Sequence, residues 1–249
     1  MQDITSSLVT IFEHFSDQLN SEKNNFRSPE VWDQISSSIR RIYRIDSFFG
    51  HDFKIPHKQP IIIDNDLGKY NSFCKYNSFC QINESYKGFL INDVVKVSFN
   101  KFYPNIICRL YEEGVLDVNI KTEAYYYLVK NSDGIKIKLT QDAKTCFNLY
   151  INYFFGLKLN SDERQKVIRR GYLITESLIK FDWIYADTDE IFFKDSTGLI
   201  NDLKLEIDYM ELPYEIEFIR EMVIFDRKKF SYIDSNGFGK IKGFRKIKK

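Results

Sequence analysis

The sequence has little of what marks secreted, membrane-spanning or disordered chains. Among its 249 residues are only 5 Pro and 11 Gly, so little of the chain has the composition of a linker. No apolar run approaches the ~18 residues that a membrane helix needs. The chain opens with Met1-Gln2-Asp3 and lacks the basic start and apolar run of a signal peptide. These absences predict a folded cytoplasmic protein with no membrane partner.

Cysteine and net charge are also scarce. The four cysteines are Cys74, Cys80, Cys108 and Cys146, with no Cys-x-x-Cys pair and no histidine nearby in sequence, so they predict free thiols and no zinc site. The formal net charge is only +1, so any attraction to a nucleic acid must come from local patches. Residues 69–74 and 75–80 both read KYNSFC, a duplication that favours a surface loop.

Periodicity predicts helices and strands in mixed order. Apolar residues at helical spacing predict helices over 4–20, from Pro29 to Gly50, from Pro104 to about Glu113, over 141–155, over 162–180 with Ser161 as its cap, and over 198–208. Residues 51–88 look irregular apart from the apolar run 61–63. Strands are expected over 94–97, 183–186, 191–194, 215–225, 230–234 and 240–244. Residues 122–139 are predicted to form a hairpin around the turn 131–134, with Tyr125-Tyr126-Tyr127 on one strand. This mixture predicts the α+β class, with one antiparallel sheet covered by helices.

Residues 185–190 read Tyr-Ala-Asp-Thr-Asp-Glu between two short strands. Two divalent ions that catalyse phosphoryl transfer need carboxylate ligands, and a strand–turn–strand presents Asp187 and Asp189 rigidly. The segment resembles motif C of family B DNA polymerases, Tyr-Gly-Asp-Thr-Asp-Ser. By itself an Asp-x-Asp turn is as often an ordinary acidic turn.

Three further segments match the same family in the same order. Residues 98–107 resemble motif A, Asp-Phe-x-Ser-Leu-Tyr-Pro-Ser-Ile-Ile, and residues 152–156 resemble the end of motif B, Asn-Ser-x-Tyr-Gly. The segment 215–244 resembles the late strands with a Lys-Lys-x-Tyr pattern, which grip the primer–template backbone. The resemblance covers about residues 50–249. It implies a polymerase palm sheet over 51–249, behind an N-terminal helical segment over 1–50.

The resemblance also assigns roles to residues. It implies Asp187 and Asp189 as catalytic residues and ligands of Mg²⁺ or Mn²⁺, if the protein is active. It implies nucleotide contacts by Tyr103, Lys144 and Asn152. It implies primer–template contacts by Lys228, Lys229, Lys242 and Arg245. The last group belongs to a basic stretch that can equally be a solvated end of the chain.

Several positions depart from the family pattern. Ser98 stands where motif A has its metal-bridging aspartate, and a hydroxyl cannot replace a carboxylate between two metal ions. We expect that loss to slow the reaction by about 10³-fold or more. Asn148 stands where motif B has a lysine, and Lys144 lies one helical turn earlier. Only residues 108–140 separate motifs A and B, so the fingers are predicted to be reduced to the short hairpin.

A neighbouring carboxylate is one way to replace the missing one. Asp64, Asp66 and Asp93 are the candidates in the sequence. Asp93 lies five residues before Ser98 on the same strand, roughly 10 Å or more away, and Asp64 and Asp66 are more simply part of a solvated turn.

Three functions stay open at this point. The first is a catalytically impaired palm protein of DNA replication that binds DNA or a polymerase or replisome partner, in the host cell's cytoplasm if the protein is viral. The second is an active minimal or split DNA-directed DNA polymerase. The third is an interaction module that keeps only the fold.

Overall fold

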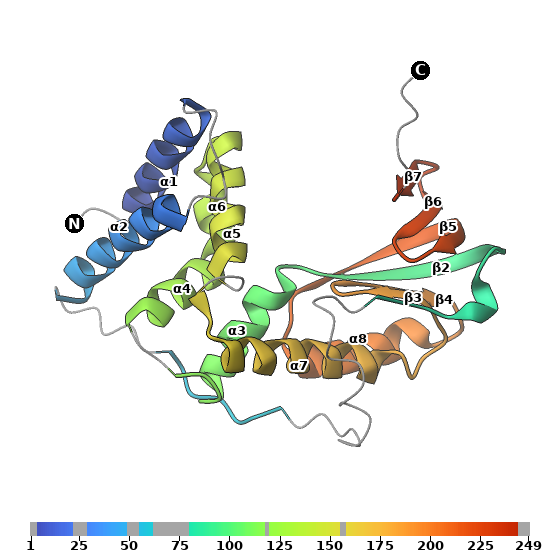
Figure 1. Ribbon diagram of the computed structural model, residues 1–249. Coiled ribbons are helices and arrows are strands. Elements are labelled where there is room, and N and C mark those ends of the chain that lie inside the picture. Colours follow the sequence, from blue (N-terminus) through green and yellow to red (C-terminus); the bar gives the residue numbers. More distant parts are fainter. Residues whose placement is uncertain are drawn as a thin grey trace. The chain divides into compact units, whose positions relative to one another are not determined.

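A computed structural model describes residues 4–21, 29–48, 55–61, 80–117, 120–154 and 158–243 (Figure 1). The chain forms two compact units, each made of two stretches of chain. The helical unit comprises residues 1–60 and 103–165, and the sheet unit comprises residues 61–102 and 166–249. The boundary expected from the sequence at residue 50 stays a prediction. Asp64, Asp66, Gly50, Arg245 and nearly all of the KYNSFC duplication lie outside the described residues.

The helical unit is built from amphipathic helices that bury aromatic side chains against one another. Phe12 packs edge-to-face on Phe147 with ring centroids 4.9 Å apart, and Trp32 lies 6.2 Å from Tyr150. The helices are α1 (Ile4–Ser21), α2 (Pro29–Phe48), α3 (Phe102–Glu112), α4 (Ile120–Lys130), α5 (Ser132–Ile137) and α6 (Gln141–Tyr153). The helices expected over 4–20 and 141–155 are confirmed as α1 and α6.

The hairpin predicted over 122–139 is wrong, because this segment forms the helices α4 and α5. The tyrosines pack as helix residues. Tyr125 is 1% exposed and stacks on Phe154 at 3.9 Å, while the Tyr126 hydroxyl donates to Glu112 Oε1 at 2.6 Å. Burial of these rings outweighs the strand propensity of a tyrosine run. Because the segment is helical, the hypothesis that its tyrosines stack bases from a strand is also wrong.

Helix α7 (Ser161–Leu178) begins in the helical unit and continues into the sheet unit. Its cap is not Ser161, as predicted, but Asn160. The Glu163 N–H donates to Asn160 Oδ1 at 3.0 Å, and the Asn160 N–H donates to Glu163 Oε2 at 2.9 Å. This reciprocal pair is a capping box, which satisfies two otherwise unpaired backbone donors.

We expect Asn160→Ala to lower the free energy of unfolding by about 1 kcal/mol, because it leaves the Glu163 N–H without its acceptor. Urea unfolding followed by circular dichroism measures the change. Ser161→Ala is the control and should have little effect, and an equal loss for both variants would contradict the assignment of the cap.

The sheet unit holds a seven-stranded antiparallel sheet in the order β1-β3-β4-β2-β5-β6-β7. β-branched and aromatic residues dominate its central strands. Helices α7 and α8 (Leu199–Met210) lie along one face of the sheet (Figure 1). The strands are β1 (Cys80–Ile82), β2 (Leu90–Phe99), β3 (Trp183–Asp187), β4 (Glu190–Lys194), β5 (Tyr214–Asp226), β6 (Lys229–Asp234) and β7 (Gly239–Lys242). A short 3₁₀ helix, η2 (Glu84–Tyr86), follows β1.

The sheet is curled, so its last strand, β7, bends over the face that carries Asp187 and Glu190. Register shifts in β5 between Ile219 and Glu221 and between Ile224 and Asp226 mark β-bulges, which increase local bending and twist. The α+β class and the N-terminal helices α1 and α2 are thus confirmed. Among the described residues, no helix is long and apolar enough to cross a membrane.

Candidate functional site

The hairpin of β3 and β4 presents the Asp-x-Asp turn as predicted. Asp187 ends β3 and pairs with Glu190, which begins β4. Thr188 lies between them at φ 50°, a left-handed conformation that is unusual for a β-branched residue. The Asp189 carbonyl accepts a hydrogen bond from the Phe99 N–H at 2.8 Å, so the turn is fixed to β2.

Four polar positions form one row across the sheet. Asp187 pairs with Glu190, Glu190 with Ser98, and Ser98 with Glu215. Paired residues of antiparallel strands point to the same face. The Asn100 side chain donates to Glu215 Oε1 at 3.0 Å. Ser98, the position that lacks the expected carboxylate, therefore lies directly between two glutamates.

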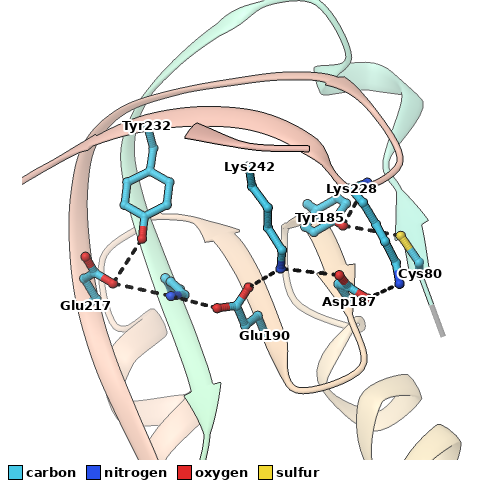
Figure 2. Close-up of polar contacts among 9 residues, drawn as sticks. Cys80, Tyr185, Asp187, Glu190, Glu217, Lys228, Tyr232 and Lys242 are labelled. Carbon is cyan, nitrogen blue, oxygen red and sulfur yellow. Dashed lines mark hydrogen bonds and ion pairs between the residues drawn. The ribbon is translucent and has the colours of Figure 1, made fainter. Parts of the chain in front are cut away.

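The carboxylates of this face are held by lysines. Lys242 Nζ lies 3.0 Å from Glu190 Oε2 and 3.5 Å from Asp187 Oδ2. Lys228 Nζ lies 3.8 Å from Asp187 Oδ1, so Asp187 faces two ammonium groups (Figure 2). Lys96 Nζ bridges Glu190 Oε1 at 3.0 Å and Glu217 Oε2 at 3.5 Å.

Lys240 completes the arrangement by contacting Glu217 Oε1 at 3.0 Å. We call the whole set the lysine–carboxylate network, and it consists of Lys96, Asp187, Glu190, Glu217, Lys228, Lys240 and Lys242. Four ammonium groups thus meet three carboxylates, which leaves one formal positive charge in excess.

The curl of the sheet is what brings the lysines to the carboxylates. β7 carries Lys242, which points toward Glu190 and Asp187 (Figure 2). It also carries Lys240, which contacts Glu217 of β5. Gly243, at φ 82°, follows β7 where an added Cβ would lie 1.9 Å from the Lys228 carbonyl oxygen. Glycine therefore permits this close approach, and the approach sets Lys242 and Lys228 on either side of Asp187.

Aromatic rings form the floor of the network. Tyr185, Phe192 and Phe230 are at most 2% exposed and pack with ring centroids 5.2 to 5.8 Å apart. Lys96 Nζ lies over the Phe192 ring at 5.8 Å and over the Tyr232 ring at 5.9 Å. A low-dielectric floor strengthens the ion pairs and makes an unpaired charge costly.

The pKa shifts follow from this geometry. Burial alone raises the pKa of Glu190, but hydrogen bonds from Lys242 and Lys96 outweigh it, so the pKa lies below its usual value. Burial alone lowers the pKa of Lys96, but its hydrogen bond to Glu190 and that residue's charge raise it overall. Asp189 takes no part in the network, and partial desolvation raises its pKa, helped by the charges of Glu190 and Asp187.

The residues do not fit a two-metal centre. Within the described part of the chain, no three His, Cys, Asp or Glu side chains are grouped so that they could hold a metal ion. Lys228 and Lys242 already form ion pairs with Asp187, and a pair of divalent cations would add further positive charge there. Asp93 lies beyond the network on β2, at φ 53°. It does not take part in the polar row.

The predicted nucleotide-contacting residues belong to the helical unit. Tyr103 is half-buried on α3. Lys144, Asn148 and Asn152 follow at intervals of four residues on α6, so they share one side of that helix. Asn148 and Asn152 are exposed and Lys144 is half-buried. Their role in binding a nucleotide stays a prediction.

The predicted DNA-contacting lysines divide into two kinds. Lys228 and Lys242 belong to the network, whereas Lys229 is exposed at the start of β6 beside the exposed Arg227. Sequence reasoning missed Lys96, Glu190 and Glu217 as members of the site. The available signal was Lys96, a charged residue in a run of buried valines.

Comparison with known proteins gives one kind of match. No protein-family model matches the sequence, and no curated protein matches it. The fold is similar to the family B DNA polymerase of the hyperthermophilic archaeon Pyrobaculum calidifontis, with a TM-score of 0.51 and 13% sequence identity. The match covers 85% of this chain and 34% of that polymerase, so the chain spans about a third of its length. The fold is thus similar to part of a family B DNA polymerase.

Proposed function

We propose that this chain is a palm protein of DNA replication that binds DNA without extending it. The observation that carries the proposal is the state of Asp187, which is 6% exposed and ion-paired with both Lys242 and Lys228. The bridging carboxylate of motif A is replaced by Ser98 at the same time. A carboxylate already neutralised by two ammonium groups is a poor ligand for Mg²⁺.

DNA binding is attributed to the turn between β5 and β6. Arg227 and Lys229 are exposed there. With a net charge of only +1, the chain must bind phosphates through a local basic group of this kind. Phosphate contacts fix the position of the duplex and carry no sequence information. Binding to primer–template DNA is therefore expected to be independent of sequence.

The test combines binding and extension on one labelled primer–template. We expect fluorescence anisotropy to detect binding that weakens steeply with salt. Replacing both Arg227 and Lys229 by Ala should reduce the slope of log K against log salt by about 2, because each phosphate contact contributes about 0.9. Lys180→Ala with Lys204→Ala makes the same charge change elsewhere in the sheet unit and serves as the control. Equal slopes for the two double variants would refute this binding surface.

The second half of the test is primer extension with dNTPs and either Mg²⁺ or Mn²⁺. We expect the chain to extend the primer no faster than Asp187→Asn. Extension that Asp187→Asn abolishes would overturn the proposal in favour of a minimal or split polymerase.

One observation favours that second function. Motif A of the family opens with Asp and motif C closes with Ser, whereas this chain has Ser98 and Glu190 at those positions, and the two are direct cross-strand partners. Compared with the family pattern, this chain lacks a carboxylate on β2 and has an additional one on β4, opposite Asp187. Under this alternative, Glu190→Gln abolishes extension as completely as Asp187→Asn does. Under the main proposal, neither change affects a reaction that does not occur.

A further inference from the structure

The last strand of the sheet has an open edge. Among the described strands, β7 pairs only with β6, and all four of its residues are exposed. The Asp234 N–H donates to the Phe238 carbonyl at 3.0 Å, which sets the hydrogen-bond alternation of the β6–β7 hairpin. Lys240 and Lys242 then bond to β6, while Gly239 and Ile241 turn their N–H and C=O groups to the open edge.

The face of the sheet opposite the network is apolar near this edge. Leu90, Val223, Ser231 and Ile241 form one row across β2, β5, β6 and β7. Leu90 is 61% exposed and Ile241 is 74% exposed. Phe89, Phe218, Phe225 and Phe238 are also exposed large hydrophobic residues of the sheet unit, between 48% and 70%. Leu90 and Ile241 are thus exposed apolar side chains on the same face of the sheet, and exposed apolar side chains that share a face are typical of interaction surfaces.

The charges near the open edge of β7 indicate what kind of segment binds there. Lys240 and Lys242 lie on the network face of β7 and are 54% and 45% exposed, whereas Ile241 lies on the opposite face. A second copy that paired through β7 with its faces aligned would place lysine opposite lysine, which is unfavourable. A strand with acidic residues on the network face and apolar residues on the other complements both faces.

We propose that β7 is a docking edge for an extended segment of another protein, whose side chains alternate between acidic and apolar residues. The segment adds an eighth strand to the sheet. Its backbone bonds to Gly239 and Ile241, its acidic side chains approach Lys240 and Lys242, and its apolar side chains continue the row that ends at Ile241. This binding does not depend on the proposed DNA binding, because it uses a different surface.

The probe is a fluorescein-labelled hexapeptide, Glu-Val-Glu-Val-Glu-Val, acetylated and amidated at its ends, measured by anisotropy with the full chain. We expect saturable binding, and about tenfold weaker binding to Ile241→Pro, which removes an outward N–H without breaking a bond to β6. Ile241→Val keeps the N–H and should bind within about twofold of the original. Gly239→Pro removes the other outward N–H and should behave like Ile241→Pro. Circular dichroism and thermal unfolding establish that both proline variants are folded.

Each alternative outcome has a definite meaning. Absence of peptide binding, or equal binding by both proline variants and the original, overturns the docking edge. Equal binding of the hexapeptide Lys-Val-Lys-Val-Lys-Val overturns the acidic character of the partner. A dimer in sedimentation velocity that Ile241→Pro converts to a monomer assigns the edge to a second copy instead. Primer–template binding is measured in parallel and is expected to be unchanged in Ile241→Pro.

Discussion

Lys96→Met is expected to lower the free energy of unfolding by about 2 kcal/mol at pH 7. The Lys96 side chain is 10% exposed and bridges Glu190 and Glu217, whose side chains are 23% and 30% exposed. Removing one partner of a buried ion pair costs about 3–5 kcal/mol, and the partial exposure of the glutamates reduces that figure. Each glutamate also keeps one lysine, Lys242 or Lys240. Methionine fills a similar volume, so the loss reports the charge.

Urea unfolding measures the effect, with Lys180→Met as the matched control. Lys180 pairs with Glu206, but its side chain is 53% exposed, so its loss should cost less than about 1 kcal/mol. Equal losses for the two variants would show that the network contributes no more than an ordinary surface pair.

The pH dependence of this stabilisation follows from the signs of the two shifts. The pKa of Glu190 is lowered from 4.5, so its contribution is present above that pH and is lost as the pH falls through the folded value. The pKa of Lys96 is raised from 10.5, so its contribution is present below that pH and is lost as the pH rises through the folded value. The difference between the original chain and Lys96→Met should therefore be largest between these limits and should shrink as the pH falls below 4.5 through the lowered pKa of Glu190.

The strands around the Asp-x-Asp turn could be predicted because local signals agreed with the fold. Residues 183–186 and 191–194 are apolar on either side of a short polar turn, and they form β3 and β4. The prediction for residues 122–139 was wrong because the local signal disagreed with the fold. The tyrosines of this segment favour a strand locally, whereas in the folded chain they pack as residues of α4, where Tyr125 stacks on Phe154.

The network could not be predicted because it depends on the curvature of the sheet. Lys242 and Glu190 are 52 residues apart in sequence and meet only because β7 bends over the face that carries β4. Nothing in the local sequence of β7 distinguishes a lysine that grips DNA from one that neutralises a carboxylate. Lys96 was the one local clue, since a lysine among buried valines must find partners on its own face of the sheet.

Ser98→Asp restores the residue that motif A has in the family, and we expect it to destabilise the sheet unit by about 1.5 kcal/mol at pH 7. The new carboxylate would lie opposite Glu190 on one side and Glu215 on the other. Like charges directly opposite each other are destabilising, by up to about 1 kcal/mol for each pair. Ser98→Asn introduces the same shape without the charge and is the control, with an expected cost well below that of Asp.

A double-mutant cycle with Glu190→Ser isolates this repulsion, because the second change removes one of the two opposing carboxylates. The cost of Ser98→Asp should fall by about 1 kcal/mol in that background, and it should also fall as the pH drops through the lowered pKa of Glu190. A cost that is unchanged in both conditions would mean that the aspartate is destabilising through packing and not through charge. The same double variant carries the family's residues at both exchanged positions, yet Lys242 and Lys228 still hold Asp187. We therefore expect it not to extend a primer, and extension by this variant alone would show that the exchange of carboxylate and hydroxyl between β2 and β4 is what silenced the site.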